Sequence, residues 1–261
     1  MRSQGPTSAP RPEVLAFLQA IKEQPADDLP RLVLADWLEE HGDPRGELVR
    51  QQVMLAHVIP GSGAGQARRM REQELRRLHE RDWLGRLAAL VDGWTCQRGL
   101  VQLSLPAATF LGAEFAQLAR TEPVAWVDGV RLTFPTAAVG TAVAASPLLA
   151  GLNLLNLGGQ SVEFDAVRIL AASEHVKNLT ALELYATALG AEGARALADS
   201  AQLGKLRHLD LDGCLIGDEG ALALAQSRHL TSLGTLHLRG NRLQSSTLTA
   251  LRARPGLSLV V

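Results

Sequence analysis

The chain contains little of several residue types that distinguish one class of protein from another. Two cysteines, Cys96 and Cys214, occur among 261 residues, and two are too few for the disulfide framework that stabilises small secreted domains. The first ten residues include no apolar run of the kind that a secretory signal needs. We therefore expect a protein of the reducing cytoplasm, with residues 1–11 as a disordered tail.

An excess of charge of one sign and a long hydrophobic run are also missing. The 26 basic and 27 acidic residues leave a net charge of −1 at pH 7, and no apolar run approaches the ~18 residues of a membrane-spanning helix. A hydrophobic share of 46% with 20% charged residues is ordinary for a globular protein. We therefore expect a folded protein with no nucleic-acid partner and no membrane partner.

Short catalytic motifs are missing as well. The chain has no Gly-x-Ser-x-Gly nucleophile turn, no Gly-x-x-x-x-Gly-Lys phosphate loop, no His-Glu-x-x-His zinc motif and no Cys-x-x-Cys pair. We therefore expect no enzymatic activity, no catalytic residue, no resident metal and no cofactor.

What the chain does contain is a repeat. The pattern Leu-x-x-Leu-x-Leu occurs four times at a constant step, since 182 − 155, 209 − 182 and 236 − 209 all equal 27. In Leu-x-Leu the two leucines lie on one face of a short strand, because side chains alternate with a period of two. One repeat cannot bury this face alone, whereas stacked repeats share a continuous core. The pattern predicts an α/β fold, a leucine-rich repeat solenoid with parallel strands on its concave side and helices on its convex side.

Weaker copies extend the repeat in both directions. Leu103 and Val130 are the upstream equivalents of Leu155, at steps of 27 and 25 residues, and a shortened strand begins at Leu257, 21 residues after Leu236. We therefore expect six repeats and a terminal strand in residues 99–261. An unpaired apolar edge invites pairing with another chain, so we expect a monomer with weak self-association through this strand.

The segments that return from one strand to the next indicate the subclass of repeat. Residues 189–199 and 216–226 are rich in Ala and Leu, with apolar residues at helical spacing. Cys214 and Asn241 occupy the interior turn position where consensus repeats have Cys or Asn. The stretch from Leu206 to Ala225 closely resembles the leucine-rich repeats of the ribonuclease-inhibitor type. That resemblance implies a helix in every convex segment.

Residues 12–58 predict a small all-α domain ahead of the repeats. An apolar stripe at helical spacing begins at Val14. A second helix is expected after Asp28, because Asp27 and Asp28 form an acidic cap and Pro30 lies in its first turn, and a third is expected from about Arg45. The run from Asp28 to Arg50 resembles the bacterial repeat-companion domain, which typically precedes leucine-rich or other repeats. The resemblance implies an accessory helical unit with no established enzymatic activity.

A joint and a cap connect this domain to the repeats. The Gly- and Ser-rich residues 59–65 predict a flexible joint. Residues 66–98 predict a helical cap, because the apolar core at the end of a solenoid must be covered from solvent. Seven arginines of the cap could contact phosphates, but acidic residues interleave with them and no aromatic stacking platform accompanies them. We favour a solvated helix face with intrahelical ion pairs. The seven are Arg68, Arg69, Arg71, Arg76, Arg77, Arg81 and Arg86.

Side chains between and beside the strand leucines point out of the core, and we call the surface that they form the strand face. Equal positions of neighbouring repeats lie about 4.8 Å apart in a parallel sheet, so they line up in rows. Tyrosine and arginine are favoured as binding anchors, and the C-terminal repeats present both, with a mixture of charges. We predict an unidentified protein partner, bound by Glu183, Tyr185, His208, Asp210, Asp212, His237 and Arg239.

Three alternatives stay open. Glu183, Asp210, His237 and the nearby His208 offer the carboxylate and imidazole groups that hold divalent metals, although an open strand face is wet. Ran GTPase-activating proteins use the same subclass of repeat. The chain has no recognisable match to their catalytic loop, and Arg131 and Arg239 are candidates by position alone. A structural, self-assembling role through the exposed edge at residues 257–261 and the helical domain of residues 12–58 is the third alternative.

Overall fold

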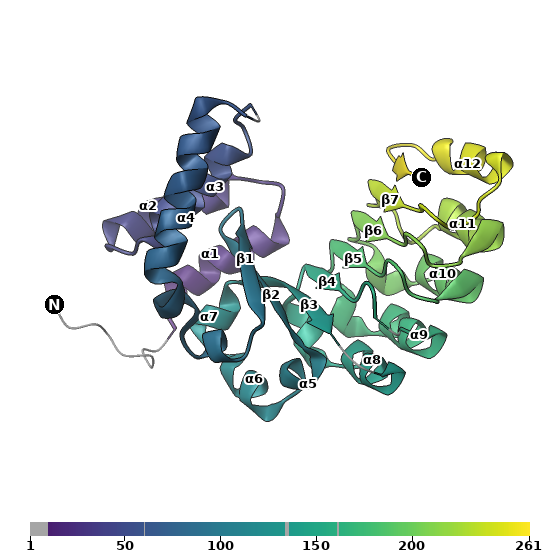
Figure 1. Ribbon diagram of the computed structural model, residues 1–261, viewed down its shortest axis with the longest axis horizontal. Coiled ribbons are helices and arrows are strands. Elements are labelled where there is room, and N and C mark those ends of the chain that lie inside the picture. The colour runs from purple at the N-terminus through teal and green to yellow at the C-terminus, as the bar shows by residue number, and fades with distance from the viewer. Residues whose placement is uncertain (1–9, 60, 134–135, 161) are drawn as a thin grey trace. The chain divides into compact units, whose positions relative to one another are not determined.

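The computed structural model describes residues 10–59, 61–133, 136–160 and 162–261 (Figure 1). These residues form two compact units. The first contains the chain up to Leu103 together with Gln117–Asp128, and the second contains Ser104–Ala116 and Gly129–Val261. The division differs from the expected boundary at residue 99, because part of the first repeat belongs to the N-terminal unit. Residues 1–9 of the expected tail lie outside the described residues.

The first unit begins with three helices, as expected for residues 12–58. Proline occupies the first turn of α1 and α2, where its missing N–H would have no partner within the helix. The core residues of α1 and α2 recur at helical spacing and are buried: Val14, Leu18, Ile21, Leu34 and Leu38. The three helices are α1 (Pro12–Glu23), α2 (Leu29–Glu40) and α3 (Arg45–Leu55).

A long helix, α4 (Gly63–Leu84), follows and begins inside the segment expected to be a flexible joint. Ser62 ends the joint, because its Oγ accepts the N–H of Gly65 at 3.2 Å and caps the helix. Pro60 lies outside the described residues.

The arginines of α4 are held partly along the helix and partly by its neighbour. Arg71 makes the expected kind of intrahelical ion pair with Glu74, at 2.7 Å, and also contacts Glu47 of α3 at 2.6 Å. Arg68 donates a hydrogen bond to Gln51 of α3 at 2.8 Å. These contacts join α3 and α4 within the first unit.

The rest of the segment expected to be a helical cap contains a strand. A 3-10 turn, η1 (Gly85–Ala89), precedes β1 (Gly93–Gln97), and β1 is the neighbour of β2 (Leu100–Pro106). Arg98 and Gly99 connect the two strands, and both have positive φ, at 48° and 86°. Positive φ at both positions is typical of the two-residue turn of a β-hairpin.

The second unit alternates short parallel strands with helices. From β2 onwards the strand order follows the chain to β8, and helices α9–α11 follow one another along one side of β4–β7 (Figure 1). The strands are β3 (Val127–Thr133), β4 (Leu154–Asn156), β5 (Ala181–Glu183), β6 (His208–Asp210), β7 (Thr235–His237) and β8 (Ser258–Val260). The helices are α5 (Ala107–Phe110), α6 (Ala113–Leu118), α7 (Glu122–Ala125, in the first unit), α8 (Ala137–Ala144), α9 (Phe164–Ala172), α10 (Gly190–Ala198), α11 (Gly217–Gln226) and α12 (Ser245–Arg252). The 3-10 turns are η2 (Pro147–Gly151), η3 (Glu174–Val176) and η4 (Ala201–Leu203).

The pairing of these strands confirms the predicted rows. The central residues of consecutive repeats are direct partners and are fully buried: Val130, Leu155, Leu182, Leu209 and Leu236. The expected short last strand is present as β8, which begins at Ser258, one residue after the expected start at Leu257. Leu259 is its partner for Leu236 and continues the row of central residues.

The interior turn position also behaves as the repeat predicts. Asn241 is buried, and its Oδ1 accepts the N–H groups of Cys214 and Ile216 at 3.1 and 3.2 Å. Its Nδ2 donates to the carbonyls of Leu211 and Leu238 at 2.7 and 3.0 Å. One side chain thus satisfies backbone groups of two successive repeats that are buried away from water.

Candidate functional site

The strand face of the second unit carries the predicted residues in register. Glu183 of β5 is the partner of Asp210 of β6, and Asp210 is the partner of His237 of β7. Backbone hydrogen bonds continue the ladder just beyond this row, from Leu184 N to the carbonyl of Asp210 at 2.8 Å and from Leu211 N to the carbonyl of His237 at 3.0 Å. Paired strands therefore fix the positions from which these side chains project.

Five of the seven predicted residues gather on β6 and β7 or directly after them. The Nδ1 atom of His237 lies 3.9 Å from Oδ2 of Asp210, and the rings of His208 and His237 meet edge to face with centroids 5.0 Å apart. Asp210 Oδ1 accepts the N–H of Asp212 at 3.0 Å, and Asp212 Oδ1 accepts the N–H of Arg239 at 2.6 Å. The backbone thus orients both aspartates within one polar cluster.

Glu183 extends this cluster by one strand. Its Oε2 accepts a hydrogen bond from Asn156 Nδ2. Burial raises the pKa of Glu183 above its ordinary value, and the neighbouring charge of Asp210 acts in the same direction, while His208 opposes both. Carboxylates crowd this part of the strand face, which therefore favours a cationic ligand or a basic partner surface.

Tyr185 is placed by a glycine of the neighbouring repeat. A Cβ atom added to Gly158 would lie 2.3 Å from Cε1 of the tyrosine ring, which means that the ring packs directly over the glycine backbone. The aromatic anchor is therefore half-buried, with its ring against the backbone of Gly158.

The two arginines proposed by position lie at different places on the strand face. Arg131 is exposed on β3, where it is the partner of Asn156 of β4. Arg239 follows β7 and is exposed, with its backbone N–H bound to Asp212. Strands β4–β6 separate the two, so they do not form one arginine cluster.

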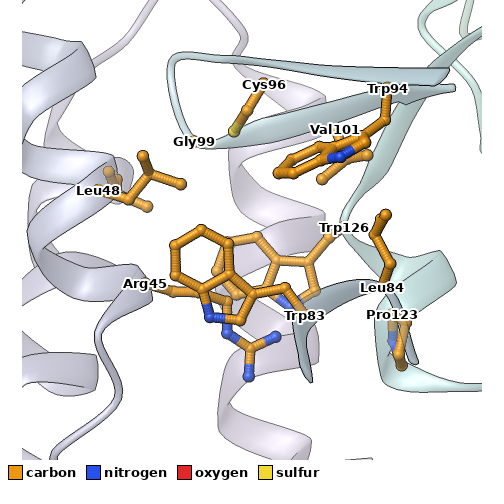
Figure 2. Close-up of a pocket in the computed structure, with 11 residues that line it drawn as sticks. Arg45, Leu48, Trp83, Leu84, Trp94, Cys96, Gly99, Val101, Pro123 and Trp126 are labelled. Atoms are coloured by element: carbon orange, nitrogen blue, oxygen red, sulfur yellow. The ribbon is translucent and has the colours of Figure 1, made fainter. Parts of the chain in front are cut away.

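A second candidate, in the first unit, was not predicted. Trp83 of α4, Trp94 of β1 and Trp126 after α7 gather around a cavity of about 20 Å³, with Leu48 and Cys96 also in its lining (Figure 2). This volume admits about one water molecule, which is far too small for a metabolite. The Nε1 atom of Trp126 is buried and has no hydrogen-bond partner among the described residues.

Arginines already occupy the faces of these rings. The guanidinium of Arg45 lies 5.0 Å from the ring centroid of Trp126, and that of Arg76 lies 4.5 Å from that of Trp94. Such contacts are worth about 0.5–2 kcal/mol each, so the cluster is better explained as packing within the first unit than as a cage for a cationic ligand.

An ion-pair network of the first unit was also missed. Arg11 and Arg45 each contact both Asp43 and Glu122, at distances from 2.6 to 3.3 Å. Burial alone would raise the pKa of either carboxyl, but hydrogen bonds from Arg45 to Asp43 and from Arg11 to Glu122 outweigh it and hold both pKa values below their ordinary range. Arg11, expected in the disordered tail, therefore binds the start of α7.

Comparison with known proteins agrees with the repeat architecture. A family model described as Leucine Rich repeat matches residues 205–225, which contain β6 and most of α11. No match was found among curated proteins. The chain therefore contains leucine-rich repeats, and such a repeat suggests a scaffold for protein interactions. Within the described part of the chain, none of the helices combines the length and hydrophobicity that crossing a membrane requires.

Proposed function

We propose that this protein is a non-enzymatic cytoplasmic scaffold that binds another protein through the strand face of its C-terminal repeats. The observation that carries the proposal is the register of β5–β7, which sets charged, imidazole and phenol groups in fixed relative positions. A surface that is already ordered loses little conformational entropy on binding. The proposed contact residues are Glu183, Tyr185, His208, Asp210, Asp212, His237 and Arg239.

The chemistry of this surface restricts the partner. Glu183, Asp210 and Asp212 make its centre acidic, while Tyr185 and Arg239 flank the carboxylates as the residue types most often found in binding hot spots. A partner with a basic or amide-rich patch of roughly 800 Å² complements this arrangement.

Charge reversal on the strand face provides the test. The double variant Asp210→Arg/Arg239→Glu and a matched variant on α9, Asp165→Arg/Arg168→Glu, both keep the net charge of the chain. Asp165 and Arg168 are exposed and form an i, i+3 pair with side-chain exposures of 71% and 60%. Each protein would capture partners from a lysate of the source organism in buffer that contains EDTA. Loss of a partner by the strand-face variant alone supports the proposal, and retention by both variants contradicts it.

We further infer that the repeats are of the ribonuclease-inhibitor type and that residues 12–58 are a repeat-companion domain. The 27-residue step and the helices α9–α12 in the return segments support the first assignment. The compact helices α1–α3 agree with the second.

A further inference from the structure

The cluster on β6 and β7 contains three groups of the kind that bind metal ions. One ligand atom each from Asp210, Asp212 and His237 lies within 4.8 Å of the other two. The three residues come from two adjacent repeats, and each is half-buried, neither fully exposed nor sealed in the core.

The distance between the side chains of Asp210 and His237 is close to the distance between two ligands of one metal ion. Asp210 Oδ2 and His237 Nδ1 are 3.9 Å apart, which is too long for a hydrogen bond. Zinc lies about 2.0–2.2 Å from imidazole nitrogen and carboxylate oxygen, so two of its ligands lie roughly 3–3.5 Å apart. Closing this gap requires a movement of roughly 0.4–0.9 Å, which is small enough for rotation of side chains that are 17% and 26% exposed.

The backbone holds the two carboxylates in a suitable orientation. Asp210 Oδ1 accepts the N–H of Asp212, and Asp212 Oδ1 accepts the N–H of Arg239. Each aspartate is therefore held through one oxygen, and the second oxygen of Asp210, Oδ2, is the one that faces His237. Hydrogen bonds of this type orient the ligands of known metal sites and contribute to their affinity.

The donor set indicates the class of ion. We propose that Asp210, Asp212 and His237 form a binding site for one divalent transition-metal ion, with Zn²⁺ as the best fit. Calcium and magnesium prefer oxygen ligands throughout, whereas an imidazole beside two carboxylates suits zinc and its neighbours in the first transition series. Three protein ligands leave at least one coordination position for water.

The surrounding charge favours a cation at this position. Glu183 lies one strand away from Asp210 in the same row, so three carboxylates share a small part of the strand face. The exposed Arg239 contacts the cluster through its backbone N–H. A divalent ion would offset the repulsion among the carboxylates more effectively than water does.

Direct metal titration tests the site without any partner. Tag-free full-length protein, stripped of metal with EDTA and desalted, would be titrated with CoCl₂ while its visible absorption is recorded, and then with ZnCl₂ against a chromophoric chelator. We expect one equivalent of Co²⁺ to produce ligand-field bands, and Zn²⁺ to displace it. His237→Ala should weaken Zn²⁺ binding at least tenfold.

Matched substitutions outside the cluster separate a site from general metal adsorption. His229→Ala and Asp199→Asn make the same chemical changes elsewhere in the second unit. They should leave the affinity for Zn²⁺ within about twofold of the wild-type value, because substitutions away from a site usually have small effects. If His237→Ala alters the far-UV spectrum, Asp212→Asn carries the same prediction. Absence of Zn²⁺ binding by the wild type at 100 μM, or equal affinity in the cluster and control variants, would overturn the proposal. The capture experiment that tests the proposed function is carried out in EDTA, which removes metal ions, so its outcome does not depend on whether this site binds Zn²⁺.

Discussion

Leu209→Ala is the substitution that tests the repeat register most sharply. Leu209 is fully buried at the centre of β6, and its neighbours in the sheet are Leu182 and Leu236. Removing three carbon atoms costs roughly 2.4 kcal/mol in transfer free energy, at about 0.8 kcal/mol per carbon. The cavity adds to this, because the paired backbones on both sides cannot collapse into it, and the expected total is about 2.5–5 kcal/mol.

The measurement is equilibrium unfolding in urea, followed by far-UV circular dichroism. Leu215→Ala provides the matched control, because Leu215 is 61% exposed and the chemical change is the same. We expect the control to change the free energy of unfolding by less than about 0.5 kcal/mol. Hydrogen exchange should also become faster at Leu184 N, which is bonded to the carbonyl of Asp210 in the ladder. A loss below about 1 kcal/mol for Leu209→Ala, or equal losses in both variants, would refute the register.

Three further predictions concern single contacts in the two units. Asn241→Ala should lower the free energy of unfolding by at least about 2 kcal/mol in urea titrations, because it leaves several buried backbone groups without partners; a change below about 0.5 kcal/mol would contradict that role. Gly158→Ala should destabilise the second unit by about 1–3 kcal/mol, because the added methyl group meets the ring of Tyr185. Tyr185→Ala should remove most of that cost in a double-mutant cycle, and additive effects would show that the ring is elsewhere. Asp43 and Glu122 have lowered pKa values in the folded protein, so their ionised forms stabilise the first unit at pH values above the ordinary pKa values of 3.8 and 4.5. This stability is lost as the pH falls through the lower pKa values of the folded protein. All four tryptophans belong to that unit, so the urea midpoint by tryptophan emission should fall with pH below about 4.5, and less so in Glu122→Gln; identical profiles would contradict the network.

The rows of the strand face could be predicted because the repeat has a constant step. When Leu182 and Leu209 occupy equal positions, every residue between them has a known lateral neighbour, and the pairing of Glu183 with Asp210 follows. The conformations of individual side chains could not be predicted in the same way. Asp212 accepts a hydrogen bond from the backbone N–H of Arg239. This contact depends on side-chain torsion angles that the repeat does not determine.

The first unit was harder to predict because its contacts are not periodic. Arg11 and Glu122 are 111 residues apart in the chain, and nothing in a single sequence selects this acid among the others. The strand β1 did leave a signal, since Trp94 and Cys96 alternate with polar residues and a two-residue turn precedes β2. The apolar residues that follow α4 continue its helical spacing towards β1. This spacing favoured the prediction of a helix over that of the hairpin formed by β1 and β2.

Hydrogen exchange of the full chain, with and without a captured partner, shows whether another protein binds the strand face of β5–β7. We expect slower exchange in the peptides that contain residues 181–185, 208–212 and 235–239, and unchanged exchange in residues 12–98. Protection confined to residues 12–98 would contradict this expectation and assign recognition to the N-terminal unit.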